Sequence, residues 1–335
     1  MKKRFFLFCT IVFCVQMQAQ EKLHYWRDSS AYLQDQASLI FEQAYKVLAV
    51  HPPGITVDDE RKLALYSLDA LLHDTRIDNG RAFLSYMERI MGNIAVELPK
   101  NKPVGREMRF FRCYNHGFVV QSASATVAID LIRGGRSDNP FVSSSLIREI
   151  VDRCDILFIT HEHGDHTDHA VIDMFLEQGK QVIVPDNFRK DMHPQFRVLR
   201  GAELIRETIQ LPARNTSLAV SVYPGHQGPL LNNVYLITLP EGRTVMHTGD
   251  QDFSTDIGAK INRANIKVDV LLAQCWMLPM REFVSNFNPS LIICGHENEM
   301  GHAIDHREAY WLTFRRMADV KVPAVVIAWG ESYNY

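Results

Sequence analysis

The chain has 335 residues, enough for one large domain or two ordinary ones with a sizeable buried core. Apolar residues make up 46% and charged residues 22%, which excludes a disordered chain and a membrane protein with many spans. Six cysteines are too few to hold a chain of this length together by disulfides, whereas fourteen histidines exceed average usage and call for an explanation.

Residues 1–19 have the pattern of a secretory signal peptide. Lys2, Lys3 and Arg4 form a positive start, an apolar run covers 5–15, and Ala19 is a small residue at a suitable cleavage point. A membrane-spanning helix needs about twenty apolar residues, so the pattern predicts cleavage near Ala19 and export to the periplasm or the exterior, without a stable membrane span.

Cleavage there removes three basic residues and no acidic one, which takes the formal net charge from −3 to −6. A mildly acidic protein without clustered Lys and Arg has no electrostatic basis for holding nucleic acid, so no nucleic acid is expected among its partners. The remaining cysteines lie in or beside apolar runs and are predicted to be buried free thiols, although a Cys275–Cys294 bridge stays open; the four are Cys113, Cys154, Cys275 and Cys294.

Residues 20–105 predict a helical N-terminal extension. One helix is expected from a cap at Ser29 or Ser30 to just before Pro52, a second opens at Asp58, and a third spans about Arg81–Val96. The buried stripe of the second helix is expected to consist of leucines, namely Leu63, Leu65, Leu68, Leu71 and Leu72. No motif in this region carries chemistry, so we expect the helices to pack on the rest of the protein.

From residue 106 to residue 335 the pattern changes to short apolar runs separated by helical periods. Strands are expected at 109–111, 118–120, 126–129, 155–160, 181–184, 218–223, 234–239, 244–247, 268–273, 291–293 and 324–328, and helices at 169–178 and 306–317. Strands mixed with helices over this length predict a layered α/β domain.

The strongest chemical signal follows the strand at 155–160. His161, His163, Asp165 and His166 supply three imidazoles and a carboxylate within six residues, the ligand types that zinc and similar divalent ions take. Residues two apart in an extended segment share a side, so His161 and His163 can hold one ion. The helical zinc motif H-E-x-x-H is absent, as is the G-x-S-x-G motif of serine hydrolases.

This cluster with its preceding strand resembles the metallo-β-lactamase superfamily of metal-dependent hydrolases. Three later segments, each after an apparent strand, are similar to the family's further ligands: Tyr223–His226, His247–Asp250 and Leu291–His296. The resemblance covers about residues 106–335 and implies a four-layer αβ/βα sandwich with the site at one edge of two paired sheets.

The resemblance also implies two divalent metal ions. One would be held by His161, His163 and His226, the other by Asp165, His166 and His296, with Asp250 bridging them. Zinc is expected, and the same ligands suit manganese and iron. A hydroxide shared by the two ions would attack the substrate, and Asp165 would orient it.

Residues near these motifs are candidates for the substrate pocket. The segment from Asn115 to Val120 resembles a turn in the ascorbate-6-phosphate lactonase branch, in which a histidine approaches the site. His116 is therefore a candidate catalytic residue that either supports the ligands from behind or faces the substrate, and the alternative is a plain turn residue. Glu297, Glu299 and His302 follow the last ligand and are expected to shape the pocket or to supply a proton to the leaving group, with His302 as the catalytic candidate. The alternative is a loop that caps the following helix. Other nearby side chains are expected in supporting or core positions, or as pocket wall: His169, His247, His306, Trp276, Met277 and Trp311.

The sequence therefore predicts an exported binuclear hydrolase of a small ester, lactone or phosphoester. The alternatives are a β-lactam hydrolase and a non-catalytic metal-binding protein of the same fold. The non-catalytic alternative is disfavoured because all seven ligand positions are filled. Redox chemistry is a separate possibility, because some relatives transfer electrons through two irons. Those relatives carry an acidic residue where this chain has His163, so this possibility is disfavoured too. The sequence leaves the oligomeric state open.

Overall fold

The computed structural model describes residues 25–185, 188, 196–199, 204–252, 267–274, 276, 279–285 and 288–335. The predicted signal peptide, Cys275 and Met277 lie outside these residues. Within the described part, no helix is long and apolar enough to cross a membrane. Cys113 and Cys154 are buried free thiols, as predicted.

The predicted N-terminal helices are present as α2 (Ser29–Val50), α3 (Asp59–Leu72) and α4 (Arg81–Glu97). Asp28 caps α2 by accepting the N–H of Ala31, so the expected serine cap is wrong. Leu63 is also mispredicted: its side chain is exposed, while the other four leucines of its stripe are buried.

Two seven-stranded sheets form the body of the molecule. The first has the order β16-β1-β2-β3-β6-β7-β8 and the second β15-β14-β13-β12-β11-β10-β9. The strands of the first sheet are β1 (Arg109–Arg112), β2 (Phe118–Gln121), β3 (Thr126–Ile129), β6 (Ile156–Phe158), β7 (Gln181–Val184), β8 (Arg197–Val198) and β16 (Ser332–Asn334). Those of the second are β9 (Ile205–Leu211), β10 (Thr216–Gln227), β11 (Leu230–Thr238), β12 (Thr244–His247), β13 (Val270–Gln274), β14 (Leu291–Gly295) and β15 (Ala324–Val326).

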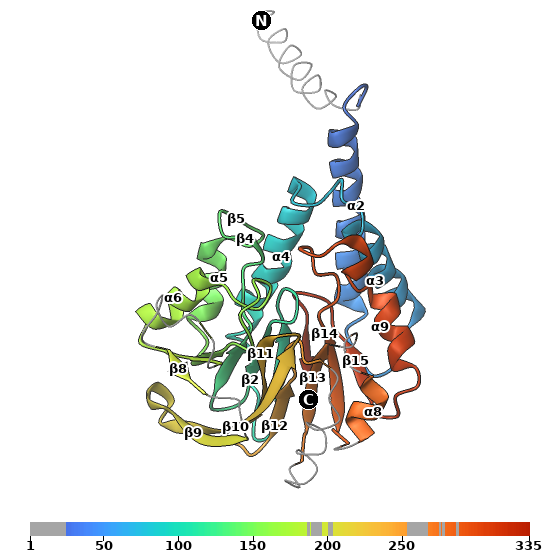
Figure 1. The fold of residues 1–335 in the computed structure, drawn as a ribbon. Coiled ribbons are helices and arrows are strands. Elements are labelled where there is room, and N and C mark those ends of the chain that lie inside the picture. Colours follow the sequence, from blue (N-terminus) through green and yellow to red (C-terminus); the bar gives the residue numbers. More distant parts are fainter. Residues whose placement is uncertain are drawn as a thin grey trace, which may run out of the picture.

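The sheets pack face to face, and helices cover their outer sides (Figure 1). Residues between the sheets are apolar on both faces, for example Phe158 from β6 against Tyr235 from β11. On the outer sides, α6 (His169–Glu177) packs on β6 and β7, and α9 (Tyr310–Met317) packs on β15. The four-layer αβ/βα sandwich is thereby confirmed.

The remaining short elements are α5 (Ser144–Val151), α8 (Met280–Ser285), the 3₁₀ turns η1 (Pro212–Arg214) and η2 (Ile304–His306), and a small hairpin of β4 (Gly135–Arg136) and β5 (Asn139–Pro140). The helix expected from residue 306 begins only at Tyr310, because the chain first makes the η2 turn.

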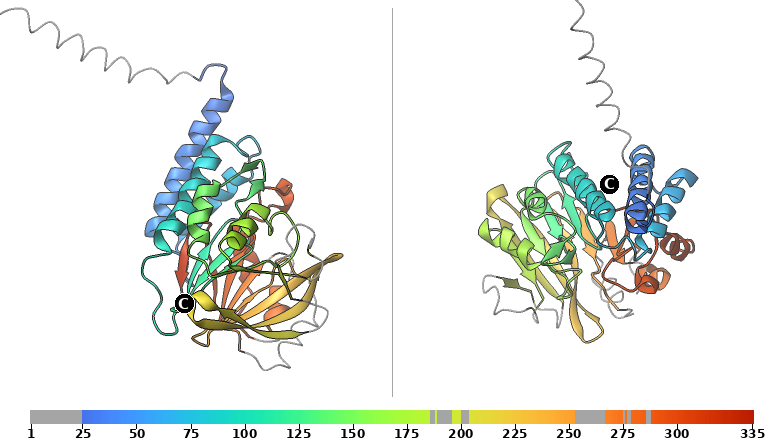
Figure 2. Two further views of the ribbon diagram at one scale, coloured as in Figure 1. Left: turned by 90° about the vertical axis from the view of Figure 1, so that its left-hand side faces the viewer. Right: turned by 90° about the horizontal axis from the view of Figure 1, so that it is seen from above.

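The N-terminal helices lie against the body and share its core (Figure 2). The guanidinium of Arg61 on α3 is buried and donates to both carboxylate oxygens of Glu331, at 2.7 and 2.6 Å, and to the carbonyl of Val326. A buried bidentate ion pair of this kind fixes α3 against the C-terminal end of the chain.

Candidate metal centre

The predicted ligands follow the carboxyl ends of strands from both sheets. His161 comes after β6, Asp250 after β12 and His296 after β14. β6 runs parallel to its two neighbours, and β12, β13 and β14 run parallel to one another, so these ends gather at one edge of the sandwich. Loops at the carboxyl ends of parallel strands are the usual place for a site in layered α/β proteins.

Two groups of potential ligand atoms share Asp250. The first contains His161, His163 and Asp250. His161 Nε2 lies 3.1 Å from His163 Nδ1 and 3.9 Å from Asp250 Oδ2. Three such atoms within the reach of one cation form a partial coordination site of N and O donors.

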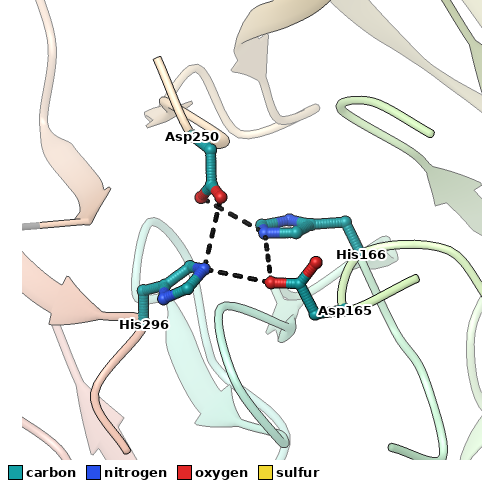
Figure 3. Close-up of side chains that lie close together, drawn as sticks. All are labelled: Asp165, His166, Asp250 and His296. Atoms are coloured by element: carbon teal, nitrogen blue, oxygen red, sulfur yellow. Dashed lines mark ion pairs between the residues drawn. The ribbon is translucent and has the colours of Figure 1, made fainter. Parts of the chain in front are cut away.

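The second group contains Asp165, His166, Asp250 and His296 (Figure 3). His296 Nε2 lies 3.2 Å from Asp165 Oδ2 and 3.3 Å from Asp250 Oδ2, and His166 Nε2 lies 3.2 Å from Asp250 Oδ1. Neither Nε2 atom makes a hydrogen bond, although both are buried. Buried polar atoms without hydrogen bonds are rare, and this donor set fits a divalent cation.

Residues that the sequence analysis did not single out orient these ligands. Asp130, which follows β3, accepts hydrogen bonds from His166 Nδ1 at 2.8 Å and from the Thr160 hydroxyl at 2.6 Å. Because Nδ1 of His166 is bound there, its Nε2 is the atom turned toward the carboxylates of the second group. Asn115 does the same for Asp165, since its amide donates to Asp165 Oδ2 at 3.0 Å.

Three residues at this edge have left-handed backbone conformations that side chains other than glycine rarely adopt: Asn115 (φ 54°), Asp130 (φ 47°) and His296 (φ 73°). Such conformations persist where the surrounding structure enforces them, and they concentrate at functional sites. Asp130 and His296 each directly follow a buried strand. This shared sequence pattern could have indicated Asp130 as a site residue.

The carboxylates set the charge of the site. Burial favours the neutral imidazole, yet the nearby charges of Asp250 and Asp165 raise the pKa of His296 to about 10 and that of His166 well above its usual value. Burial instead lowers the pKa of His161 to about 3, which leaves this imidazole neutral. The second group thus has a strong negative potential that a cation would satisfy.

One predicted ligand lies outside both groups. The His226 side chain is exposed, although its backbone is tied beside Asp250: its N–H donates to Gln251 and its carbonyl accepts from the N–H of Asp252. Adjacent strand residues point to opposite faces. In β10 it is Gln227 whose amide reaches Asp250 Oδ2, at 3.1 Å.

Of the two positions predicted for His116, the structure shows the one that supports the ligands and not the one that faces a substrate. Its ring is fully buried behind the ligands, with its centroid 4.2 Å from that of His247 and 6.2 Å from those of His166 and His296. A Cβ atom on Gly295 would lie 2.2 Å from His116 Nδ1, so only glycine fits at the end of β14. His116 therefore packs against the ligands from inside the protein.

The loop after His296 divides between two roles. Glu297 is buried and forms an ion pair of 2.6 Å with the equally buried Arg112, so it does not belong to the pocket. Glu299 and His302 do line a cavity of about 350 Å³ beside Asp165. The His302 ring stacks on that of His296, with 5.7 Å between centroids.

Of the other nearby side chains, His247 and Trp276 lie against the site, whereas the exposed Trp311 is in neither the core nor the pocket wall that the sequence predicted. His247 is buried, faces the carbonyl of His116 through Nε2 and accepts the N–H of Gly249 at Nδ1. The Trp276 ring lies edge-on to that of His296, with 5.5 Å between the ring centroids. His169 lies beside Phe188, while His306 and Trp311 are exposed.

No family model matches the chain. Among curated proteins, UPF0173 metal-dependent hydrolases of two Nitratidesulfovibrio vulgaris strains are 28% identical to it over 138 residues, which is 40% of this chain and 54% of each relative. The chain thus spans about half the length of the curated relatives it matches.

Solved structures show the same fold. Igni18, a metallo hydrolase from Ignicoccus hospitalis, has a TM-score of 0.51 and 15% identity over 68% of this chain and 98% of its own. A mutant of CmlA, a β-hydroxylase from Streptomyces venezuelae, has a TM-score of 0.50 and 16% identity over 70% of this chain and 54% of its own.

One fold here serves two reactions, so the likeness does not by itself decide the chemistry. The comparisons do not confirm the ascorbate-6-phosphate lactonase branch. The protein has the metallo-β-lactamase fold and resembles the metal-dependent hydrolases of that superfamily.

Proposed function

We propose that this protein is an exported hydrolase with two divalent metal ions that cleaves a small ester, lactone or phosphoester. The observation that carries the proposal is the pair of ligand groups joined at Asp250. Export is supported by the signal-peptide pattern of residues 1–19. Zinc is the proposed metal because imidazole and carboxylate donors suit it, and manganese and iron take the same donors.

Two bound ions would supply a water whose pKa is lowered from near 16 to about 7, together with positive charge to stabilise the developing oxyanion. The first ion would be held by His161 and His163, the second by Asp165, His166 and His296, with Asp250 shared between them. We keep His226 as a further ligand of the first ion, which would require its exposed side chain to turn inward.

The protein's own residues set the geometry. Asp130 and Asn115 fix the side chains of His166 and Asp165 by hydrogen bonds from opposite sides of the second group. Asp165 also lines the neighbouring cavity, so its carboxylate is placed to orient a nucleophile and a substrate at the mouth of that cavity. His161, His166 and His296 are themselves buried, which limits the contact of these three ligands with water.

The activity is tested with chromogenic lactone, carboxylate ester, phosphodiester and cephalosporin substrates on the zinc-loaded protein. We expect turnover of at least one of the first three and a loss of at least about 100-fold in His166→Ala, because that variant lacks a ligand of the second ion. Turnover of the cephalosporin alone would favour the β-lactam hydrolase. No turnover by a fully metal-loaded protein would favour the non-catalytic metal-binding protein.

The His226→Ala variant is measured in the same series. Loss of one ion would place His226 among the ligands in spite of its exposed side chain. Unchanged metal content would remove it from the set.

A further inference from the structure

The cavity beside the metal centre has two carboxylates in its lining, those of Asp165 and Glu299. It measures about 350 Å³ and borders Asp165, so it opens next to the second ligand group. Its walls include the apolar side chains of Ile132, Phe141 and Met300. A cavity of this size next to a reactive centre can hold the part of a small substrate that lies away from the scissile bond.

Glu299 contributes a buried carboxylate to the lining of the cavity. Its side chain is only 4% exposed. Oε1 accepts the Tyr114 hydroxyl at 2.9 Å and Oε2 accepts the N–H of His302 at 2.7 Å. A carboxylate has about four acceptor positions, so each oxygen keeps one for a ligand.

The Tyr114 hydroxyl and His302 Nδ1, which lie beside Glu299, already have partners within the protein. The Tyr114 oxygen donates to Glu299 and accepts the N–H of Met300, so its hydroxyl proton is already used. His302 Nδ1 faces the carbonyl of His306 at 3.2 Å, and a carbonyl only accepts. Nδ1 therefore donates to this carbonyl and is already used.

Three other lining residues carry side-chain donors, and all three are exposed. Asn79, Arg136 and Asn139 are exposed, and the Arg136 guanidinium is paired with Asp138 at 3.1 Å. A second negative group on a ligand in this cavity would face the carboxylate of Glu299, which is buried. Repulsion between like charges is strong in such a place.

We propose that this cavity selects esters or lactones whose distal end carries a hydroxyl or an amine, and that Glu299 excludes substrates with a carboxylate or phosphate at that end. The assignment rests on the proposed hydrolase, whose substrate class it narrows. Glu299 acts here as a specificity-determining residue.

Binding is measured by ligand-observed NMR on the zinc-loaded protein with three amides of equal length: N-methyl-6-hydroxyhexanamide, N-methylheptanamide and the mono-N-methylamide of adipic acid. These probes end in a hydroxyl, a methyl and a carboxylate. We expect the hydroxyl probe to bind at least about ten-fold more tightly than the carboxylate probe. Equal or tighter binding of the carboxylate probe by the wild-type protein would overturn the assignment, even if no variant folds.

The Glu299→Gln variant removes the charge and keeps the shape of the side chain. We expect it to reduce the preference for the hydroxyl over the carboxylate probe to about three-fold or less. Glu308→Gln is the matched control, because Glu308 follows in the same loop but pairs with Arg316 instead of lining the cavity. An unchanged preference in Glu299→Gln would contradict the role of Glu299.

Hydrolysis of the 4-nitrophenyl esters of 6-hydroxyhexanoic, heptanoic and adipic acid is measured to distinguish a failure of the proposed hydrolase from a failure of the cavity assignment. If none is hydrolysed while the binding order holds, ester hydrolysis fails and the cavity assignment stands. If the esters are hydrolysed without the expected order of kcat/KM, the cavity assignment fails and the hydrolase stands.

Discussion

At the scale of single residues, the ligands depend on the groups that hold them. Asp130 is fully buried and accepts both the Thr160 hydroxyl and His166 Nδ1. Thr160 in turn lies 3.1 Å from His161 Nδ1. One carboxylate thereby orients a ligand of the second group directly and a ligand of the first group through a hydroxyl.

We expect Asp130→Asn to weaken metal binding by about 10- to 100-fold. Oδ2 of Asp130 accepts from the Thr160 hydroxyl and from His166, and Oδ1 accepts the Thr160 N–H, so the NH2 group of an asparagine would face a donor in either orientation. Affinity is measured by competition with a chromogenic chelator. Asp155→Asn is the control: Asp155 lies just before the same strand β6, at the end away from the site, and bonds Arg214 and the N–H of Thr126. Equal weakening in both variants would contradict the orienting role.

The sequence indicated the dense histidine cluster because its residues are neighbours in the chain. It did not indicate Asn115 or Asp130, whose partners lie 50 and 36 residues away. Nor could it decide which of His226 and Gln227 faces Asp250, because the answer depends on which face of the β10–β11 hairpin turns toward the site.

At the scale of elements, helix α3 holds the loop that carries the last ligand. Asp69 on α3 accepts the amide of Asn298 at 2.9 Å and the N–H groups of Tyr310 and Trp311 at 2.8 and 3.2 Å. Arg307 in the same loop donates to both oxygens of Asp78, which follows α3. The N-terminal helices therefore fix both ends of the segment between His296 and α9.

We expect Asp69→Asn to weaken binding of one of the two ions by up to about ten-fold, since it loses roughly one charge-assisted hydrogen bond that holds the His296 loop. Zinc titration monitored by calorimetry would show one weakened and one unchanged site. The control is Asp35→Asn, the same change on α2, where Asp35 pairs with Arg81 and lies away from the loop. No difference between the two variants would mean that α3 does not support the site.

The regular elements were largely predictable because strong periodicity marks them. β12 spans the predicted residues, and α4 differs from its prediction only by one residue at its end. The small β4–β5 hairpin, α5 and β16 were not predicted. β16 has a mixed composition, so no local pattern in the sequence marks it as a strand. It is a strand because it pairs with β1, which lies far earlier in the chain.

At the scale of the whole molecule, the two sheets and the N-terminal helices form one structure around a shared edge. Ligands separated by 135 positions in the chain, from His161 to His296, meet because both sheets present strand ends there. The helices lie outside the family resemblance, yet Arg61, Asp69 and Asp78 tie them to the body by buried polar contacts. The candidate site is therefore assembled from strand ends of both sheets, and the N-terminal helices contact the loop that follows His296.

The most direct test is the zinc content of the reconstituted protein, measured by elemental analysis in the wild type, Asp250→Asn and the control Asp155→Asn. We expect about two ions per chain in the wild type and the control, and fewer than one in Asp250→Asn, because both ligand groups share this carboxylate. One or no ion in the wild type, or the same content in Asp250→Asn, would contradict the binuclear centre.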